Sequence, residues 1–244
     1  MINDEIVFSI IVPAFNEEEL LGATLDRLNQ ILAFIPDKGE IIVSDNNSTD
    51  NTAEIAEQYG ARVVFEPHQQ IARARNTGGK ASNAPYLFFV DADTLVTDNL
   101  ICTSLDALKS GSISGGGALP TFPPGSSNDK AVQWATAFWT LLSRQFKWAC
   151  GAYVFCRKDA FDAVSGFDEA FYASEEIHFS RAVNTWGKKQ NKKFIILEST
   201  IETSARKIEW FGIWGLFKMT LPILLCPFLM RSRKFCQMWY VRPE

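Results

Sequence analysis

The sequence of 244 residues predicts an α/β fold in which a mostly parallel central sheet is flanked by helices. Short apolar runs alternate with segments of helical periodicity through about the first 110 residues, a pattern typical of parallel sheets covered by helices. Polar, acidic loops follow several of the apolar runs, as expected at the ligand-binding edge of such a sheet. The composition, 47% hydrophobic and 21% charged, is that of an ordinary globular protein.

Strands are predicted where branched and aromatic residues form short uninterrupted runs. The first run is Phe8 to Val12, and Pro13 is expected to end it. Further strands are expected at residues 40–44, 62–65 and 86–90. Each is short enough for a strand buried on both faces.

Helices are predicted between these strands from apolar residues at helical spacing. Asn16 is expected to be the N-cap of the first helix, with the three glutamates after it at the positive end of the helix dipole. Further helices are expected at residues 52–59, at 71–82 with an interruption at Gly78 and Gly79, and at about 99–108.

The alternation of strand and helix patterns gives way to an irregular stretch near Ser110, the one position where a hinge between subdomains is expected. Glycines 115–117 and the irregular stretch 121–128 predict either a lid over a site or a surface linker. The following elements are then expected: an amphipathic helix at 130–146, a short strand within 148–157, a helix and turn at 161–167, a helix from Glu175 to about 186, and a strand at 194–197.

Asp91 and Asp93 directly follow the strand at residues 86–90. Residues two apart in a strand point to the same side, so the carboxylates are expected side by side. Like charges this close raise each other's pKa unless a positive charge lies between them, and a hard divalent cation would neutralise them. The alternative is that both aspartates only end the strand and cap a turn.

Three polar loops are expected at one edge of the sheet, because each follows a strand: Pro13 to Glu17, Asp45 to Asp50, and Asp91 to Asp93. Ligands of open α/β sheets bind beyond the carboxyl ends of the strands. Their convergence favours a ligand site over a simple turn at the aspartates.

Charge and cysteine content narrow the class of protein. A net charge of −4 argues against a general nucleic-acid binder. None of the five cysteines forms a Cys-x-x-Cys pair, so neither a disulfide framework nor a zinc knuckle is indicated. The acidic start of the chain is unlike a signal peptide, and a cytoplasmic location is expected.

The C-terminal residues 206–244 carry seven basic and two acidic side chains, a net charge of +5, against −9 for residues 1–205. Residues 219–230 are uncharged and are followed by Arg231, Arg233 and Lys234. An apolar stretch with a basic rim is typical of an interfacial anchor, so we expect peripheral contact with an anionic membrane surface. The alternative is a C-terminal helix packed on the body and kinked by its prolines.

Five segments, in this order, resemble family 2 glycosyltransferases, which transfer sugars from nucleotide-diphosphate donors. They are Ile10-Ile-Val-Pro-Ala-Phe-Asn-Glu17, Val43-Ser-Asp-Asn-Asn-Ser-Thr-Asp50, Ala72-Arg-Ala-Arg-Asn-Thr-Gly-Gly-Lys80, Phe89-Val-Asp-Ala-Asp-Thr94, and Gly166-Phe-Asp-Glu169 followed by Glu175-Glu176. The resemblance implies a Rossmann-like GT-A fold over residues 1–207, with a donor-binding half at about 1–110, an acceptor-binding half at about 111–207, and a helical tail at 208–244.

The resemblance also implies roles for individual residues. Asp93 would bind Mg²⁺ or Mn²⁺ directly, and Asp91 would hold the ribose or the waters of the metal; carboxylate and phosphate oxygens suit either ion. Glu176 would be the catalytic base, and Glu175 would hydrogen-bond the acceptor or steady the start of a helix. The donor-binding set would be Pro13, Ala14, Glu17, Asp45, Arg75, Asp91 and Arg206.

Alternatives remain open at this point. Arg75 is as readily explained as a solvated helix arginine, and Glu175 and Glu176 could simply favour the start of a helix. The family's usual Glu-Asp pair is Glu-Glu here, which keeps a binding or scaffold protein of the same fold in view. A sugar nucleotidyltransferase would want a glycine-rich, basic first loop, unlike Pro13 to Glu17. His178 is expected to be structural rather than a metal ligand, and His68 to be solvated.

The expected partners follow from the resemblance. The donor would be a nucleotide-diphospho-sugar, with a UDP-sugar favoured. The acceptor would be a hydroxyl group, either lipid-linked or free, in polysaccharide or glycolipid synthesis. Transfer is expected to invert the anomeric configuration.

Overall fold

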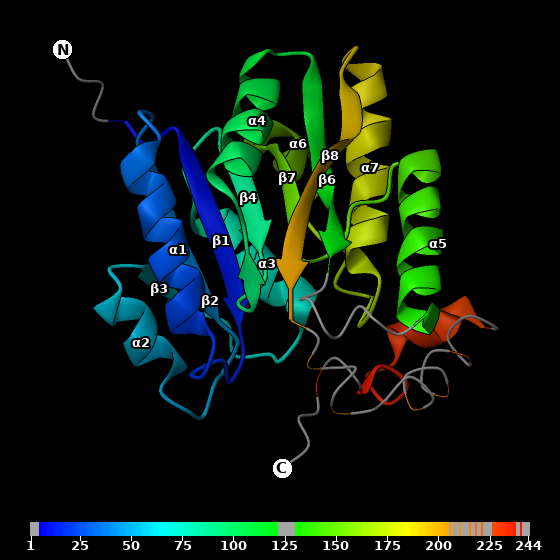
Figure 1. Ribbon diagram of the computed structural model, residues 1–244, viewed down its shortest axis with the longest axis horizontal. Helices are drawn as coiled ribbons and strands as arrows, with labels where there is room; N and C mark the ends of the chain where they lie inside the picture. Colours follow the sequence, from blue (N-terminus) through cyan, green and yellow to red (C-terminus); the bar gives the residue numbers. More distant parts are fainter. Residues whose placement is uncertain are drawn as a thin grey trace.

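The computed structural model describes residues 5–121, 130–204 and 226–237, together with residues 206, 210, 215, 218, 221 and 240. An eight-stranded sheet in the order β3-β2-β1-β4-β7-β6-β8-β5 forms the centre of the described chain (Figure 1). The pairs β1–β2, β1–β4, β2–β3 and β6–β8 are parallel, whereas β7 runs antiparallel to β4 and β6, and β5 to β8. The predicted α/β fold with a mostly parallel sheet is confirmed.

The strands are β1 (Phe8–Ala14), β2 (Gly39–Asp45), β3 (Arg62–Phe65), β4 (Tyr86–Val90), β5 (Thr94–Leu95), β6 (Ile113–Thr121), β7 (Tyr153–Arg157) and β8 (Lys193–Thr203). The helices are α1 (Leu21–Phe34), α2 (Thr52–Gln58), α3 (Ile71–Ala81), α4 (Asp98–Lys109), α5 (Lys130–Phe146), α6 (Lys158–Ala163), α7 (Glu175–Lys189) and the 3₁₀ helix η2 (Pro227–Arg231). Most bounds up to residue 110 lie within two residues of the predicted ones.

The predicted N-cap of the first helix is wrong. Helix α1 begins at Leu21, and its first turn contains no acidic residue. Asn16 has a left-handed backbone with φ 53°, and its side-chain Oδ1 accepts a hydrogen bond from the Thr49 amide at 2.8 Å. Asn16 therefore binds the loop after β2 and does not cap α1, because its side-chain oxygen accepts its hydrogen bond from Thr49.

The glycine-rich stretch predicted as a lid or linker is strand β6, buried between β7 and β8. A Cβ at Gly116 would lie 2.4 Å from Cζ of Phe155 and 2.5 Å from the Ile195 carbonyl oxygen. Glycine is needed here for close approach, not for mobility. The rest of that predicted loop, residues 122–128, lies outside the described residues.

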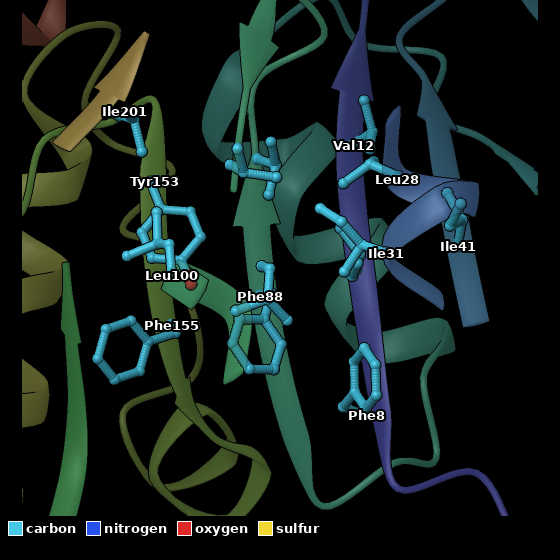
Figure 2. Packing of buried hydrophobic residues seen from close by; sticks show 14 of the residues in the cluster. Phe8, Val12, Leu28, Ile31, Ile41, Phe88, Leu100, Tyr153, Phe155 and Ile201 are labelled. Carbon is cyan, nitrogen blue, oxygen red and sulfur yellow. The ribbon is translucent and has the colours of Figure 1, made fainter. Parts of the chain in front are cut away.

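Two hydrophobic clusters cover the two faces of the sheet, because successive residues of a strand point to opposite sides. In β4, Phe88 and Val90 join the cluster that contains α1 and α4, whereas Leu87 and Phe89 join the cluster on α3, α6 and α7. Figure 2 shows the first cluster, with Phe88 beside Phe8 and Phe155. Both faces are buried, which is why β4 reads as an uninterrupted apolar run.

Strands from both predicted halves share this sheet, since β4 of the first pairs with β7 of the second. The hinge expected near Ser110 lies between α4 and β6. The two halves are therefore joined by the hydrogen bonds of a common sheet as well as by the chain.

Part of the C-terminal tail is described, and that part packs on the body. The Tyr172 amide donates to the Met230 carbonyl at 2.7 Å, and buried Cys236 packs against Ala173. Half of the uncharged stretch 219–230, residues 219, 220 and 222–225, lies outside the described residues. Within the part of the chain that the structure describes, no helix is long and apolar enough to cross a bilayer.

Candidate active site

The loops after β1 and β2 meet at one edge of the sheet, as predicted. Ala14 pairs in register with Asp45, and the Asn46 amide donates to the Ala14 carbonyl at 2.8 Å. The Glu17 amide donates to Thr52 Oγ1 at 2.8 Å. These bonds fix the first loop against the second, so that both present their polar groups beyond the same strand ends.

Asp45 and Ala14 are both buried, at 6% and 2% exposure, and Pro13 is half-buried. Asp45 Oδ1 accepts a hydrogen bond from the Ser48 amide at 3.2 Å. This bond closes a turn within the second loop and orients the carboxylate at the end of β2. Contact of these three residues with a donor stays a prediction.

Asp91 and Asp93 follow β4 as predicted, and each carboxylate is paired with its own arginine. Asp91 Oδ1 accepts from Arg75 Nη2 at 2.9 Å, and Asp93 Oδ2 accepts from Arg206 Nη2 at 2.9 Å. The positive charge that was expected near these two carboxylates is thus supplied by the guanidinium groups of Arg75 and Arg206. Asp91 also closes a turn, because its carbonyl accepts from the Thr94 amide at 3.1 Å.

Arg206 lies at a junction of the first loop, the aspartate turn and the end of β8. Its Nη2 donates to Glu17 Oε2 at 3.0 Å as well as to Asp93. Ser204 Oγ donates to the same Asp93 oxygen at 2.5 Å. Burial lowers the pKa of Arg206, but the carboxylates of Glu17 and Asp93 outweigh it and the net shift is upward. Arg206 is therefore positioned beside the predicted metal ligand.

Arg75 is 2% exposed, so the alternative interpretation that it is a solvated arginine on the helix surface is wrong. Its Nη1 donates to Glu175 Oε1 at 2.5 Å, and its Nη2 donates to Asp91 and, at 2.9 Å, to the Gly151 carbonyl. Burial lowers the pKa of Arg75, but Asp91 and Glu175 raise it by more, and the guanidinium stays charged. The contact with a donor expected from the sequence stays a prediction.

Glu175 and Glu176 are the first residues of α7, and Glu175 is bonded to Nη1 of Arg75 whereas Asp91 is bonded to Nη2. Glu175 is 4% exposed and bonded to Arg75. Burial raises the pKa of Glu176 to about 8; Glu175 adds to the rise, Arg75 opposes it, and Asp91 adds to it. The two adjacent glutamates thus have different surroundings: Glu175 is bonded to Arg75, whereas burial favours the protonated form of Glu176.

His178 packs within the protein and His68 is exposed to solvent, as expected for each. His178 stacks on the ring of Phe171 with the centroids 3.8 Å apart. Burial, with Arg181 and Arg231 nearby, lowers the pKa of His178, although Asp168 opposes the shift. The side chain of His68 is 71% exposed and its Nδ1 lies 3.3 Å from Glu66 Oε1.

Two contributors to this cluster were not predicted. Ser204 binds Asp93 through its hydroxyl, and Gly151 offers its carbonyl to Arg75. Ser204 directly follows β8 and lies two residues before Arg206, so its nearness in sequence to a predicted site residue is the one signal that could have indicated it. Gly151 directly follows Cys150 ahead of β7, and no signal in the sequence distinguishes its carbonyl from others.

The ligand atoms at this edge are of a type that a hard divalent cation prefers, since Asp91 and Asp93 offer carboxylate oxygens where the loops converge. Among the described residues, no group of three or more His, Cys, Asp or Glu side chains is arranged to hold a metal. A metal at this edge would therefore take further ligands from a bound anionic substrate or from water, an arrangement typical of Mg²⁺ and substrate phosphates.

Comparison with known proteins identifies the family. The family model described as glycosyl transferase family 2 matches residues 9–161, a range that contains the first two loops, α3 and the aspartate turn. The chain belongs to glycosyl transferase family 2. An uncharacterised glycosyltransferase of Mycobacterium tuberculosis is 40% identical over 85 residues, 35% of this chain and 36% of that protein. The chain thus matches about a third of the length of this curated relative.

Solved structures of glycosyltransferases share the fold. TarS of S. aureus in complex with UDP-GlcNAc has a TM-score of 0.64 at 16% identity, covering 97% of this chain and 76% of that one. The mannosyltransferase PcManGT of Pyrobaculum calidifontis, in complex with GDP-Man and Mn²⁺, has a TM-score of 0.63 at 15% identity, with 97% and 74% covered. The expected GT-A fold is confirmed by these neighbours.

Proposed function

We propose that this protein is an inverting glycosyltransferase that moves a sugar from a nucleotide diphosphate to a hydroxyl acceptor. One observation carries the proposal: buried Arg75 joins Asp91, which follows β4, to Glu175, the first residue of α7 and the neighbour of Glu176. The arrangement supports a donor held at the strand ends and a base on the opposite side. Membership of glycosyl transferase family 2 supports the same reaction class.

The donor would lie across the ends of β1 and β2. Pro13, Ala14 and Glu17 would surround its base and ribose, and buried Asp45 would accept a hydrogen bond from a base N–H. A carboxylate at the end of a buried strand is held in one orientation, which suits recognition of a planar base. A UDP-sugar is the favoured donor, although TarS and PcManGT bind differing nucleotides, UDP-GlcNAc and GDP-Man.

Asp93 and Asp91 would hold Mg²⁺ or Mn²⁺ beside the diphosphate. When bound, such a cation neutralises the charge that develops on the leaving phosphate. Arg206, already next to Asp93 and Glu17, would turn one guanidinium edge to the phosphate oxygens, since its fork matches paired oxygens. The Mn²⁺ found with GDP-Man in PcManGT supports the metal assignment.

Glu176 would be the general base. The acceptor oxygen attacks the anomeric carbon, its proton passes to the Glu176 carboxylate, and the bond from the anomeric carbon to the diphosphate oxygen breaks. One displacement of this kind inverts the anomeric configuration, and general-base help of this type typically contributes about 10²–10⁴ in rate. Glu175, bonded to Arg75, would steady the start of α7 or bind the acceptor.

The acceptor would be a polysaccharide or glycolipid hydroxyl, either lipid-linked or free, with the protein at the inner face of a membrane. The basic residues Arg231 and Arg233 are exposed, although each also stacks on an aromatic ring, Phe171 and Tyr240 respectively. Peripheral contact through the tail at residues 208–244 is part of the proposal.

A donor screen tests the proposed function. The melting temperature is measured with UDP, GDP and dTDP, each with and without Mn²⁺. A nucleotide at 100 times its dissociation constant adds about 2.7 kcal/mol of stability, so one nucleotide should raise the melting temperature only when Mn²⁺ is present. If no nucleotide shifts it under any condition, the donor assignment is wrong.

A further inference from the structure

Helix α3 is bonded through its polar side chains to the segment that leads into α7. Gln70 Nε2 donates to the carbonyls of Glu169 and Phe171, at 2.7 and 2.9 Å. Asn76 Nδ2 donates to the Phe167 carbonyl at 2.8 Å, and the Phe167 amide donates back to Asn76 Oδ1 at 2.7 Å. These partners are about 90 to 100 residues apart in sequence, so α3 acts as a frame for the acceptor-side segment.

Arg75 lies within this frame and binds three separate parts of the chain. Its partners are Asp91 after β4, the Gly151 carbonyl before β7, and Glu175 at the start of α7. Its guanidinium also lies over the ring of Phe167, 5.3 Å from the centroid. A planar group with donors on two nitrogens can serve all three acceptors at once, which an ammonium group cannot do with the same geometry.

Gly151 allows this close approach. A Cβ there would lie 3.3 Å from Arg75 Nη2 and 3.6 Å from Cδ of Glu176. The carboxyl of Glu176 is therefore next to the Arg75 bridge. Removing the guanidinium would leave Glu175, 4% exposed, as an uncompensated buried charge.

We propose that Arg75 is a positioning residue that bridges Asp91 and Glu175 and thereby holds Glu176 opposite the donor. Its Nη groups are used within the protein, so this role replaces the donor contact that the sequence suggested. The inference deepens the proposed function and rests on it. A displacement of about 1 Å in a reacting group can cost about a hundredfold in rate, and the bridge sets the distance between the two sides.

The main test compares Arg75→Lys with Arg73→Lys. Arg73 is on the same helix, but its side chain is 37% exposed and pairs with Glu169, so it controls for loss of an arginine from α3. Binding of UDP and GDP with Mn²⁺ is measured by calorimetry, and turnover as nucleotide release from UDP-GlcNAc and GDP-mannose.

Arg75→Lys should bind the nucleotide within about twofold of the parent while kcat falls by about a hundredfold. Arg73→Lys should keep both binding and kcat. A loss of nucleotide affinity that matches the loss of turnover would show that Arg75 is a donor ligand and overturn the proposal. Parental turnover in Arg75→Lys would overturn it as well.

A second measurement needs no substrate. Arg75→Met, Glu175→Gln and the double variant are compared in thermal unfolding, with Arg75→Lys in place of Arg75→Met if the latter does not fold. The bridge predicts that the double variant loses less melting temperature than the two single losses combined. Additive losses would overturn the bridge. If the parent protein binds no nucleotide while the losses are non-additive, the proposed function fails and the bridge stands.

Discussion

The raised pKa of Glu176 predicts how turnover changes with pH. A general base accepts a proton only as the carboxylate. With a pKa of about 8, about one tenth of Glu176 is ionised at pH 7, so kcat/KM should rise about tenfold from pH 7 and level off above about pH 9. A carboxyl at its ordinary value of 4.5 would give a flat profile over that range.

The assay is the initial rate of nucleotide release, measured from pH 5 to pH 10 with the donor found in the screen. Glu176→Gln should lower kcat by about a hundredfold or more, abolish the rise, and leave nucleotide binding unchanged. Glu198→Gln is the matched control, because the side chain of Glu198 is 78% exposed. A flat profile from pH 7 to pH 10 would refute the burial argument. Near-normal turnover in Glu176→Gln with collapse in Glu175→Gln would move the base by one residue, and a product with retained configuration would refute single displacement.

Three further predictions concern the metal, the backbone and the tail. Asp93→Asn should abolish transfer and weaken Mn²⁺-dependent nucleotide binding, measured by calorimetry, while the melting temperature changes little. Gly166→Ala should destabilise more than Gly111→Ala in denaturant unfolding: both residues have positive φ, which costs about 1–2 kcal/mol, but only at Gly166 would the new Cβ meet Asn76 Oδ1, at 2.3 Å. The chain should sediment with anionic vesicles, and high salt should release part of it.

Each of these has a contrary outcome. Unchanged turnover in Asp93→Asn would remove the metal assignment. Equal losses of stability in the two glycine variants would show that the Asn76 contact costs nothing. If a chain ending at Lys207 sediments with vesicles as well as the full chain does, the tail at residues 208–244 is not the anchor.

The sequence predicted the sheet well where local pattern and burial agree. Tyr86–Val90 is apolar throughout because both faces of β4 are covered. The apolar run therefore predicted both the strand and the position of the two aspartates at its end. The sequence misled at Gly115, Gly116 and Gly117, where glycine suggested a lid or linker, because a close-packed strand and a loop both call for small residues. Only the neighbouring Phe155 and Ile195 separate the two cases, and they lie far along the chain.

The sequence indicated which residues belong to the site, but it did not indicate which side chains bond to one another. Convergence of the loops after β1 and β2 follows from parallel pairing, which alternation implies. The pairing of Asp91 with Arg75 and of Asp93 with Arg206 could not be predicted, because it depends on side-chain direction and burial. The same holds for Asn16, whose partner is in the next loop, although its position before a helical pattern is typical of an N-cap.

The contact between Arg206 and Glu17 has a consequence for how the protein is made. The two residues are 189 positions apart, so this corner of the site joins an early part of the chain to a late one. Residues 8–14 and 39–45 can pair as soon as both have emerged from the ribosome, but the first loop waits for residue 206 before its carboxylate gains this partner. Contacts of such sequence separation are slow to form. A ribosome-bound chain stalled before that point is therefore expected to have β1 and β2 paired, while the contact of the first loop with Arg206 is still missing.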